Sequence, residues 1–188
     1  MKMLSEVHFT SEYLAGLIEP SLDTAMISIA DPDHIPPDVT PTGWGCFYQA
    51  FFIDGDYDAE TIKTFGPQFR STFSGYLMEE QAVEIRSFIH SAVEDSHIDK
   101  MIVHCTAGKS RSAAVAKYAA ELSGGVLTGE HGLDHINTMV YQLLQKPSLY
   151  KSHLDEQRDD MQRVRAEGSM SALDQILGTV RRMWSTSA

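Results

Sequence analysis

A cysteine and an arginine six positions apart are the residues of this chain best suited to chemistry. Cys105 follows an apolar run, KMIVH, and Arg111 precedes an alanine-rich run, SAAVAKYAAEL. This order predicts a strand, a tight loop and a helix, which places the thiol beside the backbone N–H groups of a helix N-terminus, where anions bind. The helix dipole and the guanidinium would both favour the thiolate, which is the nucleophilic form of cysteine.

The loop between these two residues suits a tetrahedral oxyanion. It consists mostly of small residues: Thr106, Ala107, Gly108, Lys109 and Ser110. Such a loop can point successive N–H groups at one anion, and the planar fork of Arg111 can bind two phosphate oxygens. The Ser112 hydroxyl can donate a hydrogen bond to the sulfur. The pattern predicts attack by Cys105 on a phosphoryl group, and water then hydrolyses the phosphocysteine.

The run HCTAGKSRS resembles the signature of the cysteine-dependent protein tyrosine phosphatases, including the dual-specificity group. With its alanine-rich helix, it is most similar to the small tyrosine phosphatase-like proteins of bacteria and phages. The resemblance implies that Cys105 is the nucleophile and Arg111 the phosphate clamp. It also implies that Ser112 assists the second step and that His104 supports the cysteine.

The resemblance is strong over residues 101–122 and looser over residues 7–144. It implies a general acid as well, because the leaving oxygen needs a proton. In the family an aspartate upstream of the cysteine supplies that proton, and three aspartates follow the apolar run CFYQAFFI. Asp54 best matches the strand-then-aspartate pattern, Asp56 is the next candidate, and Asp58 is the third.

Several alternatives remain open beside a phosphotyrosine phosphatase that also accepts phosphoserine or phosphothreonine. Lys109 resembles the loop lysines of phosphoinositide phosphatases, so a phosphoinositide or another small phosphate ester is an alternative substrate. The chain could also be a non-catalytic phospho-binding module, or a rhodanese-type sulfurtransferase. A nucleotide-binding P-loop fits poorly, because its pattern requires glycine where the chain has Val103. The segment 59–77 is a candidate lid or substrate rim, or it packs on the body.

Composition narrows the class and the location. The chain has 188 residues and a net charge of −11, which disfavours nucleic acid and anionic membranes as partners. Its two cysteines, Cys46 and Cys105, argue against a disulfide scaffold. No run is long enough to span a membrane, and the N-terminus lacks a signal-peptide core, so we expect a cytoplasmic protein. The resemblance to the phosphatases implies a phosphorylated protein or peptide as its partner. We expect no cofactor and no metal, since the closest approach to a ligand set, Glu130, His131 and His135, lies in a glycine-containing segment that suits a surface loop or cap better than a zinc site.

Strands alternate with helices along the chain. Apolar runs predict strands at 7–9, 25–30, 46–53 and 100–104. Helical spacing predicts a helix at 11–18 with Ser11 as its N-cap, a helix at 78–95 with Val83 on its apolar side, a helix at 135–145 with Asp134 as its N-cap, and an amphipathic helix at 171–184. This alternation predicts an α/β fold in one domain, with a mainly parallel sheet of about four to five strands flanked by helices. The phosphate-binding loop would lie between the central strand and a helix. We expect residues 1–147 to form the phosphatase domain and residues 148–188 a helical extension packed on it.

Overall fold

The structure is a computed structural model that describes residues 3–33, 39–156, 158–159 and 162. Chain contacts divide it into two units, one of residues 1–58 and 73–149, the other of residues 59–72 and 150–188. The predicted packing of the extension 148–188 on the domain stays a prediction. Its expected amphipathic helix over 171–184 lies outside the described residues.

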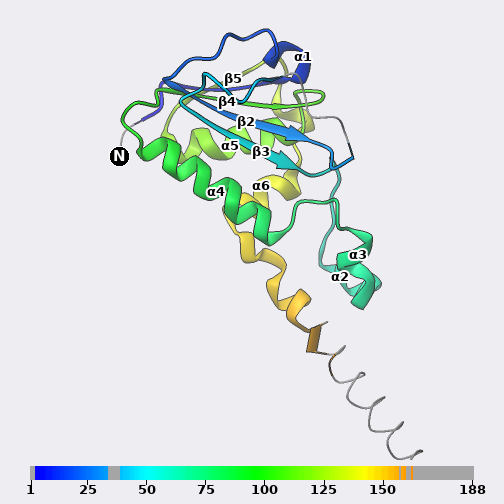
Figure 1. The fold of residues 1–188 in the computed structure, drawn as a ribbon. Coiled ribbons are helices and arrows are strands. Elements are labelled where there is room, and N and C mark those ends of the chain that lie inside the picture. The colour runs from blue at the N-terminus through cyan, green and yellow to red at the C-terminus, as the bar shows by residue number, and fades with distance from the viewer. Residues whose placement is uncertain (1–2, 34–38, 157, 160–161, 163–188) are drawn as a thin grey trace, which may run out of the picture. The chain divides into compact units, whose positions relative to one another are not determined.

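The first unit is built on one sheet of five parallel strands (Figure 1). The strands are β1 (Glu6–Ser11), β2 (Thr24–Ala30), β3 (Cys46–Phe51), β4 (Lys100–Cys105) and β5 (Val126–Gly129). Their order across the sheet is β3-β2-β4-β1-β5, and every neighbouring pair runs parallel. This arrangement confirms the predicted α/β class and parallel sheet, and it puts the cysteine-bearing strand β4 in the centre.

Helices lie in the connections from β1 to β2, from β3 to β4 and from β4 to β5, as is usual between parallel strands, whereas a loop without a helix among its described residues joins β2 to β3. The helices of the first unit are α1 (Glu12–Ala15), α4 (Glu79–Glu94), α5 (Arg111–Ser123) and α6 (Thr138–Gln145), with 3₁₀ turns η2 (Leu133–His135) and η3, which runs from Pro147 to Tyr150 at its boundary. The second unit contains α2 (Ala59–Phe65), η1 (Gly66–Gln68) and α3 (Phe69–Thr72).

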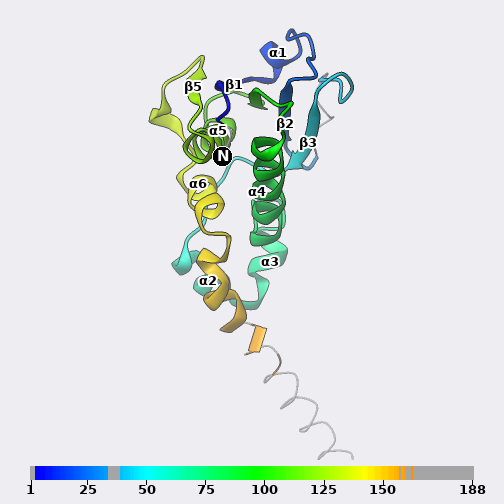
Figure 2. The ribbon, with the colours of Figure 1, turned by 90° about the vertical axis from the view of Figure 1, so that its left-hand side faces the viewer.

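The two faces of the sheet carry different cores, because successive side chains of a strand point to opposite sides. The face that carries Val7, Met101 and Val103 packs against α5, which contacts β1, β4 and β5. The other face carries a small cluster built around Met26 and Trp44 under α1. Figure 2 shows α1 on the opposite side of the sheet from α4, α5 and α6.

Most predicted helix ends are confirmed, and two details are wrong. Ser11 caps α1 by accepting a hydrogen bond from the Leu14 N–H, although α1 is shorter than expected. Asn137 caps α6, not Asp134, which lies in η2 instead. Val83 was expected on the buried stripe of α4 but is 46% exposed, because it projects from a different side of the helix than the fully buried Ile85 and Ile89.

Candidate active site

Cys105 is the last residue of β4, at the carboxyl edge of the sheet where parallel sheets bind ligands. Its side chain is only 1% exposed. The sulfur lies 3.2 Å from the hydroxyl oxygen of Ser112, in the first turn of α5. The hydroxyl that the sequence singled out is therefore a hydrogen-bond partner of the thiol, and a hydrogen bond donated by that hydroxyl would stabilise a thiolate.

Arg111 begins α5, and its guanidinium is held from one side. Its side chain is buried, with the residue 4% exposed. Nη1 donates to the Asp31 carboxylate at 2.6 Å and to the carbonyl oxygen of Phe52. Nη2 lies 3.4 Å from the hydroxyl of Thr106, and Nε finds no acceptor among the described residues. Because Nε and Nη2 share one edge of the planar group, the edge with spare donors faces the loop.

Gly108 lets the loop pass close to the end of β1. Its φ of +68° lies in the left-handed region that other residues rarely adopt. A Cβ at this position would lie 2.3 Å from the Ser11 backbone nitrogen and 2.5 Å from the Thr10 carbonyl carbon. Only glycine fits here without moving the backbone, so the shape of the loop depends on it.

We expect Gly108→Ala to destabilise the protein and to distort the loop. A left-handed alanine costs about 1–2 kcal/mol, and the contact with β1 adds to that cost. Gly66→Ala is the matched control, because Gly66 also has a positive φ but would meet no atom within 4 Å. Urea unfolding should show a larger loss for Gly108→Ala, by at least about 1 kcal/mol. If both variants lose the same free energy of unfolding, Gly108 does not approach the end of β1 closely.

Asp54 contacts the loop, as a general acid would have to. It is exposed, and its Oδ1 accepts hydrogen bonds from the Ser110 hydroxyl at 2.7 Å and the Asn137 side-chain amide at 3.0 Å. Asp56 and Asp58 are also exposed and lie further along the same segment. Of the three candidates, the structure brings Asp54 to the loop that joins β4 to α5.

Asn137 was missed at the sequence level. Its Oδ1 accepts the Val140 N–H at 2.9 Å, which caps α6, while its Nδ2 donates to Asp54 and to the Gly55 carbonyl oxygen at 3.2 Å. The preference of asparagine for helix N-caps was the available signal. Because one amide serves both the helix and the aspartate segment, Asn137 fixes Asp54 relative to α6.

The segment that carries Asp54 is also held from residues 73–77. The backbone N–H of Ile53 donates to the Gly75 carbonyl at 2.8 Å, and the buried Tyr57 donates its hydroxyl to the Leu77 carbonyl at 2.9 Å. The Tyr57 ring contacts the ring of Phe73 at a centroid distance of 6.2 Å. These contacts fix both ends of the short turn around Asp54.

His104 lies beside the cysteine in sequence but points to the opposite face of β4. Its ring is 0% exposed and neither ring nitrogen finds a partner among the described residues. Burial lowers the pKa of His104 to about 4, so the ring is neutral at pH 7. Its register partners are Thr10 on β1 and Ser28 on β2. Any support that His104 gives to the cysteine therefore acts through the backbone of β4.

Cys46 is too far from Cys105 to form a disulfide with it. It starts β3, and its register row runs through Ala25 to Met101, four residues before Cys105. At about 3.3 Å per residue that offset alone exceeds the reach of a disulfide, which needs Cα atoms within about 7 Å. Burial raises the pKa of the Cys46 thiol, and the negative charge of Asp95 raises it further. Cys46 is a partly buried structural thiol.

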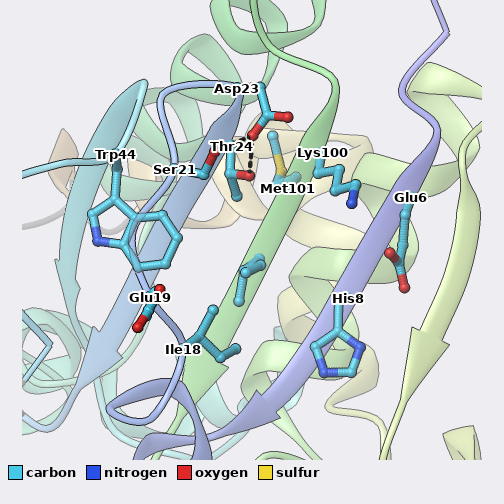
Figure 3. A pocket seen from close by; sticks show the side chains of 11 residues that line it. Glu6, His8, Ile18, Glu19, Ser21, Asp23, Thr24, Trp44, Lys100 and Met101 are labelled. Carbon is cyan, nitrogen blue, oxygen red and sulfur yellow. Dashed lines mark hydrogen bonds between the residues drawn. The ribbon is translucent and has the colours of Figure 1, made fainter.

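A hollow of about 420 Å³ lies away from Cys105. Its walls include the first residues of three strands, Glu6, Thr24 and Lys100, so it opens at the amino edge of the sheet. Figure 3 shows Trp44 on one side of it and His8 on another. The hollow and the cysteine loop are thus separate features, at opposite ends of β4.

Two kinds of feature are absent from the residues that the structure describes. None of their helices combines the length and the apolar character that crossing a membrane needs. None of their histidine, cysteine, aspartate and glutamate side chains gather in threes or more as metal ligands would. The site itself combines a buried thiol beside a hydroxyl, a buried guanidinium with spare donors and a carboxylate bound to the same loop. No protein-family model, no curated protein and no solved structure matches this chain.

Proposed function

We propose that this protein is a cysteine-dependent phosphatase of the tyrosine or dual-specificity kind. The Cys105 thiolate attacks the phosphorus of a phosphate monoester, and the bond from phosphorus to the substrate oxygen breaks. Asp54 gives its proton to that oxygen. Water then attacks the phosphocysteine, its proton passes to Asp54, and the thiolate leaves with help from the Ser112 hydroxyl.

The contact of the Arg111 guanidinium with the cysteine loop is the observation that carries this proposal. The side chain is buried, yet the edge formed by Nε and Nη2 has unused donor capacity among the described residues, while Nη1 is bound to Asp31. A buried donor without an acceptor costs about 1–3 kcal/mol, which a bound anion would remove. Two parallel N–H donors match two oxygens of a phosphoryl group.

We expect Asp54 to act as the general acid, so the effect of its substitution on kcat should depend on the leaving group of the substrate. Asp54→Asn should lower kcat for phenyl phosphate by about 100-fold or more, because phenolate is a poor leaving group without a proton. The loss should be smaller for p-nitrophenyl phosphate, whose leaving group needs less help. Steady-state kinetics on both substrates measures this difference.

Asp56→Asn is the control for that experiment. This variant also removes one negative charge from an exposed carboxylate, but at a position two residues after Asp54. Asp56→Asn should leave the ratio of the two turnover rates near that of the wild type. If Asp56→Asn gives the leaving-group-dependent loss and Asp54→Asn does not, the general acid is Asp56.

The proposed activity is tested by the release of p-nitrophenol from p-nitrophenyl phosphate. A burst stoichiometric with enzyme, followed by steady turnover, is expected for a phosphocysteine mechanism. Absence of turnover would leave a phospho-binding module, and turnover of thiosulfate instead would identify a sulfurtransferase. A phosphorylated protein or peptide substrate and a cytoplasmic location belong to the same proposal.

A further inference from the structure

Carboxylates from three different strands surround the cysteine loop. Asp31 follows β2 and binds Arg111 at 2.6 Å. Asp54 follows β3 and binds Ser110 at 2.7 Å. Glu130 follows β5 and accepts hydrogen bonds from the Thr10 hydroxyl and from the Ser11 backbone nitrogen, the atom that also limits space at Gly108. The end of β4 therefore has carboxylates on both sides along the sheet, Asp31 and Asp54 after β2 and β3, and Glu130 after β5.

Further exposed carboxylates lie a few residues from these contacts. They are Asp33, Asp56, Asp58 and Asp134. The lysine and arginine in the same described segments, 31–33, 53–58, 106–111 and 130–137, are Lys109 and Arg111. Arg111 is paired with Asp31 and buried, so within these four segments the exposed lysine or arginine is Lys109. The segments around the loop are together strongly negative.

This charge pattern divides the site into two parts, which we call the floor, at Arg111 and the start of α5, and the rim, where the exposed carboxylates lie. At the floor, the N-terminus of α5 and the buried Nε of Arg111, which has no acceptor in the described part of the chain, would attract one phosphoryl group. The rest of the substrate would lie among the exposed carboxylates named above, which we call the rim carboxylates. Their charges act on a substrate over about 8 Å at physiological salt. A second phosphate on the substrate would be repelled there, and a lysine or arginine would be attracted.

We propose that the substrate of this site is a phosphorylated protein segment whose flanking residues are basic. The proposal rests on the phosphatase activity proposed above and adds the class of substrate to it. It also sets the role of Lys109: one exposed lysine is outweighed by the rim carboxylates, so the site disfavours polyanionic phosphoinositides. Complementary charge of this kind acts mainly on the association rate and therefore on kcat/KM.

The test compares four substrates with the full chain. They are p-nitrophenyl phosphate, a phosphotyrosyl peptide flanked by lysine and arginine, the same peptide flanked by glutamate and aspartate, and a soluble short-chain phosphoinositide. We expect kcat/KM for the basic peptide to exceed that for the acidic peptide by about 10-fold at low salt, as several exposed charge pairs acting together allow. The ratio should shrink as salt rises from about 0.02 M to about 0.5 M.

A charge-reversal variant locates the effect. Asp33→Lys combined with Asp134→Lys reverses two rim charges, and should reduce the ratio of basic to acidic peptide by about five-fold or more. The matched control is Glu19→Lys combined with Glu94→Lys, which changes the net charge equally. Glu19 lines the hollow at the amino edge of the sheet, and Glu94 ends the helix that precedes β4. The control should keep the wild-type ratio.

The outcomes separate the two proposals. If p-nitrophenyl phosphate is not hydrolysed, the phosphatase proposal fails and this one fails with it. If it is hydrolysed but the acidic peptide or the phosphoinositide is preferred, or the peptide ratio does not change with salt, only the proposed substrate class is wrong. Should the rim variant fail to fold, the four wild-type substrates still decide the question. If the ratio of basic to acidic peptide falls equally in the rim and control variants, the preference comes from net charge. The proposed role of the rim carboxylates would then be wrong.

Discussion

Cys105→Ser is expected to abolish turnover while leaving the anion site able to bind. A serine hydroxyl is not ionised at pH 7, so the covalent step is lost, and kcat should fall by at least about 10⁴-fold. The loop, Arg111 and the N-terminus of α5 are unchanged by this substitution. Inorganic phosphate should therefore still raise the melting temperature of the variant, since at 100 times Kd a ligand stabilises by about 2.7 kcal/mol.

Cys46→Ser makes the same chemical change at the other cysteine. Cys46 lies at the amino end of β3, whereas Cys105 lies at the carboxyl end of β4. The control variant should keep wild-type turnover. Full activity in Cys105→Ser would contradict the proposed mechanism. Loss of activity in Cys46→Ser alone would identify Cys46 as the nucleophile instead.

Arg111→Lys is expected to be the second most damaging substitution. A lysine keeps the charge but offers no planar fork, so it cannot bind Asp31, the Phe52 carbonyl and two phosphoryl oxygens together. Loss of such a preorganised donor typically costs about 100- to 1,000-fold. We expect a fall of that size in kcat/KM for p-nitrophenyl phosphate, with weaker competitive inhibition by inorganic phosphate.

Arg86→Lys provides a control with the same side-chain exchange. Arg86 on α4 donates from Nη1 to the carbonyl oxygens of Leu144 and Gln145, both at 2.8 Å. Its substitution should change stability but leave kcat/KM within about two-fold, because these contacts are not part of the loop. If Arg111→Lys retained wild-type kcat/KM, the buried guanidinium would be a structural group and not a phosphate clamp.

The strands were the most predictable part of the fold. All seven residues of β2, TAMISIA, are buried, as its mostly apolar sequence predicts for a parallel strand that is covered on both faces. β5 was missed because VLTG is four residues long and begins and ends with exposed residues, which leaves no pattern to detect. The predicted N-cap of α6 was wrong because aspartate and asparagine both favour N-cap positions. In the structure Asn137, and not Asp134, is the residue that caps α6, and its side chain also contacts Asp54.

The site was predictable only where it is local in sequence. Cys105, Gly108, Arg111 and Ser112 lie within eight consecutive residues, and the structure brings them together. Asp31 meets Arg111 across 80 positions, and no local pattern in the sequence links the two residues. Asn137 meets Asp54 across 83 positions. Such contacts depend on strand order and on loop shape, which a single sequence does not specify.

The most direct test of the central claim is to trap the covalent intermediate. The enzyme is mixed with a phosphotyrosyl peptide that carries a radiolabelled phosphate, and the reaction is stopped within milliseconds by acid. The mechanism predicts a transient label on the proteolytic fragment that contains Cys105, bound through sulfur and absent from Cys105→Ser. Turnover that proceeds with no protein-bound label, or with the label on another residue, would contradict it.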